Sequence, residues 1–165
     1  MRYSFENVAV LVGEVKTVKN GELLQAILGS CVGVCFLWRE QNICGLAHCL
    51  LPTEGKLSKE KVTARHVNQG VQALLVLMGI DTAAEKKEIE ALVAGGGSMM
   101  TQFLQRDLQI GKRNIEAAIK CLARNGIENV HVIASGAYGT KVTIDSSNYT
   151  YQIKSIPKLG ENQNG

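Results

Sequence analysis

Cysteine and histidine side chains gather in one stretch of the chain, residues 27–52, which reads ILGSCVGVCFLWREQNICGLAHCLLP. This stretch holds four of the five cysteines and one of the three histidines of the 165-residue chain. A cysteine thiolate is a strong nucleophile, and a nearby imidazole can take the thiol proton and later return it. The first question is therefore whether Cys31 and His48 meet in the folded protein.

The positions of these two residues are compatible with a pair that faces across a β-hairpin. Residues 31–38 and 43–51 both have the apolar pattern of buried strands, with a polar turn between them. A two-residue turn at Arg39-Glu40, or a four-residue turn that begins one residue earlier, places Cys31 directly opposite His48. Directly opposed residues have Cβ atoms about 4.5–5.5 Å apart, which lets a thiol and an imidazole form a hydrogen bond.

A metal site is the competing interpretation, because Cys31, Cys35, Cys44 and His48 would all share that face of the hairpin. Cys31 and Cys35, however, lie four residues apart on one strand, which is roughly 13 Å at about 3.3 Å per residue. Zinc bonds are about 2.0–2.3 Å long, so one zinc ion cannot bind both thiolates. We therefore predict no metal and no cofactor, and we interpret Cys35 and Cys44 as a directly opposed pair in the core.

A Cys–His pair supports acyl transfer, in which the thiolate attacks a carbonyl and water later hydrolyses the thioester. An imidazolium beside the thiol would lower the pKa of Cys31. Gly29 and Ser30 precede Cys31 and predict a tight turn whose backbone amides can stabilise an oxyanion. The residues alone leave a second interpretation open, in which Cys31 is one more buried thiol and His48 is a hydrogen-bonded core histidine.

The rest of the chain predicts an α+β domain with a mixed sheet that positions this stretch. Apolar residues at helical spacing predict two amphipathic helices, at residues 62–78 and at about 112–125. Residues 95–98, GGGS, lack a P-loop lysine and predict a turn that packs closely beside the catalytic strands. Strands are expected as one bent or two short strands in residues 8–18, and then at residues 23–28, 31–38, 43–51, 89–94, 130–134, 141–145 and 149–153.

Composition limits the classes of function. With 45% hydrophobic and 20% charged residues and a formal net charge of +3, the sequence is typical of a globular protein and has no basic stripe for nucleic acid. No apolar run approaches the roughly 20 residues that span a bilayer, and the N-terminus lacks the pattern of a signal peptide. We expect one cytoplasmic domain over residues 1–157, with free thiols, and a polar, disordered tail at residues 158–165.

Four ordered segments resemble a known family. LGSCVGVC at residues 28–35, GLAHCLLP at 45–52, AGGGSMM at 94–100 and IGKRN at 110–114 together resemble the chemotaxis receptor glutamine deamidase family, CheD. The resemblance implies a cytoplasmic hydrolase of chemotactic signal transduction, a protein-glutamine glutaminase with a cysteine nucleophile. Such enzymes convert selected glutamines of chemoreceptors to glutamate and release ammonia, and some members also hydrolyse glutamate methyl esters.

The same resemblance implies a mixed β-sandwich flanked by helices, similar to the catalytic domain of cytotoxic necrotizing factor toxins. It assigns the nucleophile to Cys31 and the general base to His48. The partners that it implies are the cytoplasmic helices of chemoreceptors and, in some members, a CheC-type phosphatase that competes with the receptor.

The chain departs from the family six residues before the nucleophile, where a catalytic Thr is common and Gln25 stands here. The amide oxygen of Gln25 could accept the imidazole N–H and orient the ring, as a third catalytic residue does. In the other interpretation Gln25 is a solvent-facing strand residue and the site is a Cys–His dyad. Loss of the Thr also leaves open a catalytically weakened adaptor, which binds a receptor or a CheC-type phosphatase without deamidating it.

Overall fold

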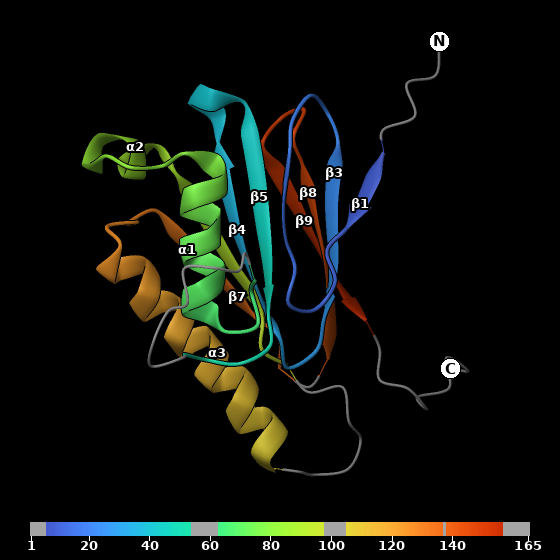
Figure 1. Ribbon diagram of the computed structural model, residues 1–165. Coiled ribbons are helices and arrows are strands. Elements are labelled where there is room, and N and C mark those ends of the chain that lie inside the picture. Colours follow the sequence, from blue (N-terminus) through green and yellow to red (C-terminus); the bar gives the residue numbers. More distant parts are fainter. Residues whose placement is uncertain (1–5, 54–62, 98–104, 137, 157–165) are drawn as a thin grey trace.

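The computed structural model describes residues 6–53, 63–97, 105–136 and 138–156. In these residues two mixed β-sheets pack face to face, and helices cover the outer face of one sheet, which makes the fold α+β (Figure 1). No helix in this part of the chain is long and apolar enough to cross a bilayer. The predicted tail at residues 158–165 lies outside the described residues.

The first sheet has four strands in the order β1-β3-β8-β9. β1 runs parallel to β3, and the other neighbours are antiparallel. Along β3, Leu24, Ala26 and Leu28 are buried against the second sheet, whereas Gln25 and Ile27 face outward. The strands are β1 (Asn7–Ala9), β3 (Leu23–Leu28), β8 (Gly139–Asp145) and β9 (Thr150–Ile156).

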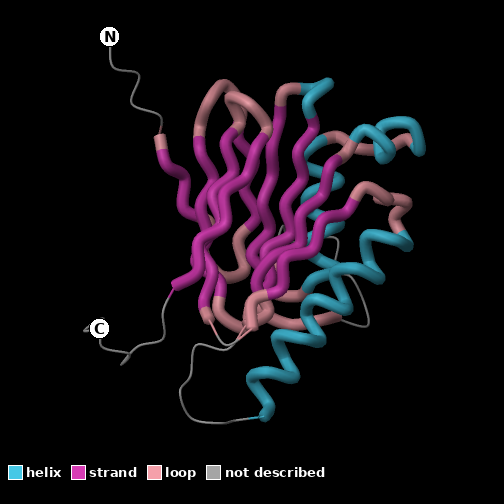
Figure 2. Tube along the Cα trace, turned by 180° about the vertical axis from the view of Figure 1, so that it is seen from behind, coloured by secondary structure: helices cyan, strands magenta, loops and turns pink. Residues whose placement is uncertain are grey.

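The second sheet has five strands in the order β2-β5-β4-β6-β7 and lies between the first sheet and the helices (Figure 2). Every residue of β4 and β5 is buried, because one face packs on the first sheet and the other on the helices. The strands are β2 (Val15–Val18), β5 (Ile43–Cys49), β4 (Val32–Trp38), β6 (Glu90–Gly95) and β7 (Val130–Ala134). Every strand predicted from the sequence is therefore present, with ends that differ by a few residues.

The described helices are α1 (Val67–Met78), α2 (Ala83–Glu88) and α3 (Gln105–Arg124). The predicted start of α1 is wrong, because residues 63–66 are not helical. There the chain pairs with the segment after β5: His66 bridges to Leu51, whose carbonyl accepts the N–H of Val67. The second predicted helix coincides with the later part of α3, which begins earlier, at Gln105, and ends at Arg124. The helix α2, which has a Thr82–Glu85 capping box, was not predicted.

The hairpin between β4 and β5 differs from the predicted register. Its loop is a 3₁₀ turn (Arg39–Gln41) followed by Asn42, which has a left-handed backbone with a φ of 54°. The two-residue turn predicted at Arg39-Glu40 is thus too short by two residues, and the predicted four-residue turn begins one residue too early. Either way, every cross-strand pair shifts by two residues. His48 lies opposite Gly33, so the prediction that Cys31 directly faces His48 is wrong.

The cysteine pair predicted from the same register is also wrong. Cys35 lies opposite Leu46, and Cys44 lies opposite Leu37. Both cysteines are nevertheless fully buried in the core between the two sheets, as predicted. A shift by two residues leaves each side chain on its original face of the strand, which explains why the core assignment holds although the pairing does not.

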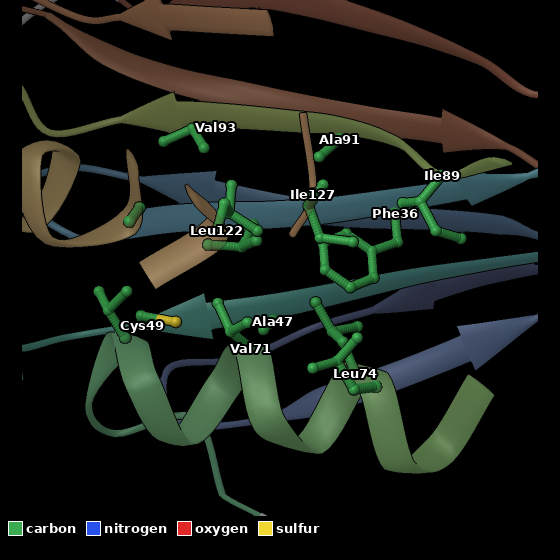
Figure 3. Close-up of a cluster of buried hydrophobic side chains, with 14 of the residues drawn as sticks. Phe36, Ala47, Cys49, Val71, Leu74, Ile89, Ala91, Val93, Leu122 and Ile127 are labelled. Atoms are coloured by element: carbon green, nitrogen blue, oxygen red, sulfur yellow. The ribbon is translucent and has the colours of Figure 1, made fainter. Parts of the chain in front are cut away.

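The core between the second sheet and the helices depends on close packing of α1 against β5. Leu74 of α1 is fully buried and lies beside Phe36 of β4 (Figure 3). Gly45 of β5 permits this approach, because a Cβ atom at that position would lie 2.7 Å from the Leu74 side chain. The helical layer is therefore held by a side chain that fills the space above a glycine.

We expect Leu74→Ala to lower the free energy of unfolding by about 2–5 kcal/mol, since it leaves a cavity against β5. Val76 on the same helix is 64% exposed, so Val76→Ala should change that free energy by only about 0.5 kcal/mol. Urea denaturation of both variants measures the difference. Equal losses would contradict the close packing of α1 on the sheet.

Candidate active site

Cys31 and His48 point into the same space between the two sheets, although they are not directly opposed. Cys31 immediately precedes β4, and His48 of β5 lies opposite Gly33, two residues further along. The two residues are therefore diagonal neighbours, whose Cα atoms are typically about 7–8 Å apart. Both are nearly buried: 8% of the surface of Cys31 and 3% of that of His48 is exposed.

The imidazole of His48 is held by a backbone carbonyl. Its Nδ1 lies 2.9 Å from the carbonyl oxygen of Val10. A carbonyl oxygen can only accept, so Nδ1 carries the proton and Nε2 carries the lone pair. Among the described residues, the buried Nε2 has no hydrogen-bond partner. This tautomer leaves Nε2 available as a base on the face of the sheet that also carries Cys31.

The segment that carries Val10 is bonded to the backbone of His48. The N–H of His48 donates to the carbonyl of Glu14 at 3.0 Å, and its carbonyl accepts the N–H of Gly13 at 2.8 Å. The N–H of Val10 donates to the carbonyl of Gln25 on β3 at 2.8 Å. The segment between β1 and β2 therefore connects the two sheets at the position of His48 and fixes the orienting carbonyl.

The side chain of Gln25 does not orient His48. Gln25 faces outward from β3, and its Nε2 donates to Oγ1 of Thr143 at 3.5 Å. Of the two interpretations of Gln25, the geometry favours the strand residue without contact to the imidazole nitrogens, because the hydrogen bond to His48 is made by the carbonyl of Val10. A backbone carbonyl has no residue signature, so nothing in the sequence singles out Val10.

The turn before Cys31 is fixed by three hydrogen bonds to consecutive carbonyls. Gly29 O accepts from the N–H of Gly97 at 2.9 Å, and Cys31 O accepts from the N–H of Gly96 at 2.9 Å. Ser30 O accepts from the side-chain amide of Asn114 at 2.9 Å. Among the described residues, the amides of Ser30 and Cys31 donate to no other residue, so both can serve a bound oxyanion.

Gly95, the last residue of β6, and the glycines that follow it make this arrangement sterically feasible, as predicted for residues 95–97; residue 98 of the predicted turn lies outside the described residues. Gly95 has a φ of 102°, and a Cβ atom there would lie 2.5 Å from the carbonyl oxygen of Cys31. On the other side, a Cβ atom at Gly111 of α3 would lie 2.3 Å from the carbonyl oxygen of Gly96. Backbone therefore packs directly on backbone from α3 through the glycine turn to Cys31.

Asn114 of α3 connects the two strands that carry the candidate catalytic residues. It is fully buried, and besides Ser30 O its Nδ2 donates to the carbonyl of Leu50 at 3.0 Å. Ser30 adjoins Cys31, and Leu50 lies two residues after His48. We did not single out Asn114 from the sequence, although the IGKRN segment that contains it belongs to the family resemblance.

Burial keeps both candidate catalytic groups neutral. It raises the pKa of the Cys31 thiol, and it lowers the pKa of His48, although the hydrogen bond to Val10 and the charge of Glu14 oppose this shift. The predicted imidazolium, which would lower the thiol pKa, is therefore not the resting state.

A cavity of about 300 Å³ reaches His48 from the surface. Its buried end is formed by Val10, Ala26 and His48, which are 2%, 3% and 3% exposed. At the mouth the side chains of Leu11 and Ile27 are more than half exposed. This recess is large enough for a short side chain to enter toward the imidazole.

Within the described residues, no group of three or more His, Cys, Asp or Glu side chains is arranged to hold a metal ion. Cys49 faces the core beneath the helices, and Cys121 of α3 packs against the same core. Burial raises the pKa of Cys121 and Cys49, which makes both thiols poor nucleophiles.

Comparison with known sequences identifies relatives over most of the chain. The family described as CheD chemotactic sensory transduction matches residues 50–155. A protein of Bdellovibrio bacteriovorus named "Probable chemoreceptor glutamine deamidase CheD" is 39% identical over 152 residues, which cover 90% of this chain and 94% of that protein. A match of this extent includes the stretch that contains Cys31 and His48.

Two further comparisons are weaker. A protein of Ruegeria named "Probable chemoreceptor glutamine deamidase CheD 2" is 31% identical, and the match covers 92% of this chain and 93% of that protein. Among solved structures, the Bacillus licheniformis hypothetical protein YfiH matches 74% of this chain and 50% of its own, with a TM-score of 0.44 and 15% identity. That likeness is too low to support an argument.

The neutral resting pair predicts how alkylation of Cys31 by iodoacetamide depends on pH. Because burial raises the pKa of Cys31, its alkylation rate should keep rising above about pH 8.5, where an ordinary thiol titrates. Mass spectrometry of the Cys31 peptide measures the rate, and His48→Ala should leave the profile nearly unchanged. A rate that levels off below pH 7 in the wild type but not in His48→Ala would demonstrate an ion pair instead.

Loss of the Asn114 side chain should leave two buried carbonyls without donors. We expect Asn114→Ala to lower the free energy of unfolding by about 2–4 kcal/mol, which urea denaturation measures. Asn125 follows α3 and bonds locally to the carbonyl of Cys121, so Asn125→Ala should cost only about 1 kcal/mol. If both variants lose the same stability, Asn114 does not connect the two strands.

Proposed function

We propose that this chain, which belongs to the CheD family, hydrolyses glutamine side-chain amides of chemoreceptors to glutamate and ammonia. The names of its relatives describe this activity. The hydrogen bond from His48 Nδ1 to the carbonyl of Val10 supports the chemistry most directly, since it leaves a proton-free Nε2 on the same face as a cysteine. Cys31 is the nucleophile and His48 the general base and acid.

The first half of the reaction forms a thioester. Nε2 of His48 takes the proton of the Cys31 thiol while Sγ attacks the carbonyl carbon of the glutamine amide. The tetrahedral intermediate carries a negative oxygen, for which the amides of Ser30 and Cys31 are donors. His48 then returns its proton to the amide nitrogen, and the C–N bond breaks with release of ammonia.

The second half regenerates the enzyme. A water molecule loses a proton to Nε2 of His48 and attacks the thioester carbonyl, and the C–S bond breaks as the proton passes to the sulfur of Cys31. The products are glutamate and the free thiol. A glutamate methyl ester would follow the same route with methanol as the leaving group, so we include ester hydrolysis in the proposal.

The family resemblance supplies the finer parts of the proposal. The substrate glutamines lie on cytoplasmic helices of chemoreceptors, and a CheC-type phosphatase competes with the receptor for the enzyme. The sandwich of two sheets with helices on one side would then be similar to the catalytic domain of cytotoxic necrotizing factor toxins. Gln25, at the position of the family's Thr, contacts Thr143 and is not required for proton transfer.

A catalytically weakened adaptor is the second candidate function. Two observations favour it: burial raises the pKa of the Cys31 thiol, and no hydrogen bond joins Cys31 to the free Nε2 of His48. Such a protein would bind a receptor or a CheC-type phosphatase and modify it slowly or not at all. Catalytic hydrogen bonds often tighten only when substrate binds, so the absence of a Cys31–His48 hydrogen bond is compatible with the enzyme.

Mass spectrometry of a chemoreceptor cytoplasmic fragment incubated with the purified protein separates these functions. We expect a gain of about one mass unit at individual glutamines, because an amide NH₂ is replaced by OH. Cys31→Ala and His48→Ala should abolish this gain while they leave binding of the fragment intact. Gln25 also lines the cavity, but Gln25→Ala should keep kcat, since its amide is hydrogen-bonded to Thr143 and not to the imidazole.

The outcomes are distinct. Binding without a mass change by the wild type would establish the adaptor. Deamidation by Cys31→Ala would refute the nucleophile, and a loss of kcat in Gln25→Ala would restore the orienting role to Gln25.

A further inference from the structure

A row of three outward-facing residues crosses the first sheet at the mouth of the His48 cavity. Ile27 of β3 pairs with Lys141 of β8, and Lys141 pairs with Lys154 of β9. Ile27 and Lys141 both line the cavity that reaches His48. We call these three residues the Ile27–Lys154 row. It leads from the candidate active site across the open face of the sheet.

The two lysines of this row repel one another. Directly opposed residues of antiparallel strands have Cβ atoms about 4.5–5.5 Å apart, and like charges in such pairs destabilise a sheet. Among the described residues neither lysine forms a salt bridge. The nearest acidic residue on β8, Asp145, is four residues away and accepts hydrogen bonds from Ser147. A repulsive pair without a counter-charge is compensated when an acidic partner binds.

The other side of the cavity mouth is apolar. Leu11 and Val12 of the segment between β1 and β2 are 63% and 52% exposed, and Ile27 is 60% exposed. Glu14 in this segment is already neutralised by Lys16, at 3.4 Å. The mouth thus combines an apolar side, formed by Leu11, Val12 and Ile27, with a basic side, formed by Lys141 and Lys154. Exposed apolar side chains beside an unpaired charge of one sign are typical of an interaction surface.

We propose, on the basis of the proposed function, that the Ile27–Lys154 row with Leu11 and Val12 binds an acidic, partly apolar segment of the receptor around the substrate glutamine. The glutamine side chain enters the cavity toward His48, apolar side chains beside it contact Leu11, Val12 and Ile27, and its acidic neighbours lie over Lys141 and Lys154. The lysines select glutamines with acidic neighbours and do not take part in the chemistry.

The charge-reversal variant Lys141→Glu/Lys154→Glu tests this surface with a chemoreceptor cytoplasmic fragment as the probe. We expect kcat/KM for deamidation to fall by about tenfold or more through a higher KM, because attraction is replaced by repulsion. The wild type should lose affinity for the fragment as salt rises, since ions screen exposed charges beyond about 8 Å at physiological ionic strength. In the variant this dependence should be reversed, because salt then screens a repulsion.

Lys87→Glu/Lys120→Glu is a matched control with the same change in net charge. Both lysines are exposed and lie on α2 and α3, in the helical layer on the far side of the second sheet. This control should leave KM unchanged. Ile27→Gln is a second variant that should raise KM without altering the salt dependence. The iodoacetamide reaction of Cys31 in each variant shows that the site is still folded.

The experiment distinguishes an error in the proposed binding surface from an error in the proposed deamidase function. If the wild type deamidates the fragment and Lys141→Glu/Lys154→Glu has an unchanged KM, the surface is refuted and the function stands. If the wild type binds without deamidation and binding depends on the two lysines, the function is refuted and the surface stands. If the wild type neither binds nor modifies the fragment, both are refuted.

Discussion

The arrangement of the site depends on one backbone turn whose three consecutive carbonyls are all held by other parts of the chain. The glycine turn after β6 binds the carbonyls of Gly29 and Cys31, and the side chain of Asn114 binds the carbonyl of Ser30. In the proposed mechanism the amides of Ser30 and Cys31, which donate to no other described residue, bind the oxyanion of the intermediate. The same Asn114 side chain also binds the carbonyl of Leu50, so α3 sets the separation between the start of β4 and the end of β5.

The burial of the site determines the kind of catalysis that it can support. In the space between the sheets the charged forms of both Cys31 and His48 are disfavoured, so the resting pair is a thiol and a neutral imidazole. In the proposed mechanism this thiol becomes a nucleophile only when its proton has an acceptor. The carbonyl of Val10 provides that condition, because it keeps the proton on Nδ1 and the lone pair on Nε2.

Much of this protein could be predicted from residue types and spacing. The strands follow from short apolar segments between turns, and the shared face of Cys31, Cys35, Cys44 and His48 follows from alternation along two strands. The register could not be predicted, because several turns were compatible with the sequence. The observed loop occupies residues 39–42, with Asn42 in a left-handed backbone, and this position shifts all pairs by two residues. The start of α1 could not be predicted either, because pairing between Leu51 and His66 outweighs the local helical pattern.

The sequence by itself determined the chemistry that is available: a cysteine after a Gly-Ser turn, a histidine on the neighbouring strand, and glycines where backbone must approach backbone. These features are local, and side-chain type and spacing are sufficient to indicate them. Only the tertiary structure decided how the histidine is oriented and how the turn is held. Asn114 contacts Ser30 across 84 residues of sequence, and Val10 acts through a carbonyl that every residue possesses. Neither contact has a local pattern, because each exists only after the sheets and α3 have packed.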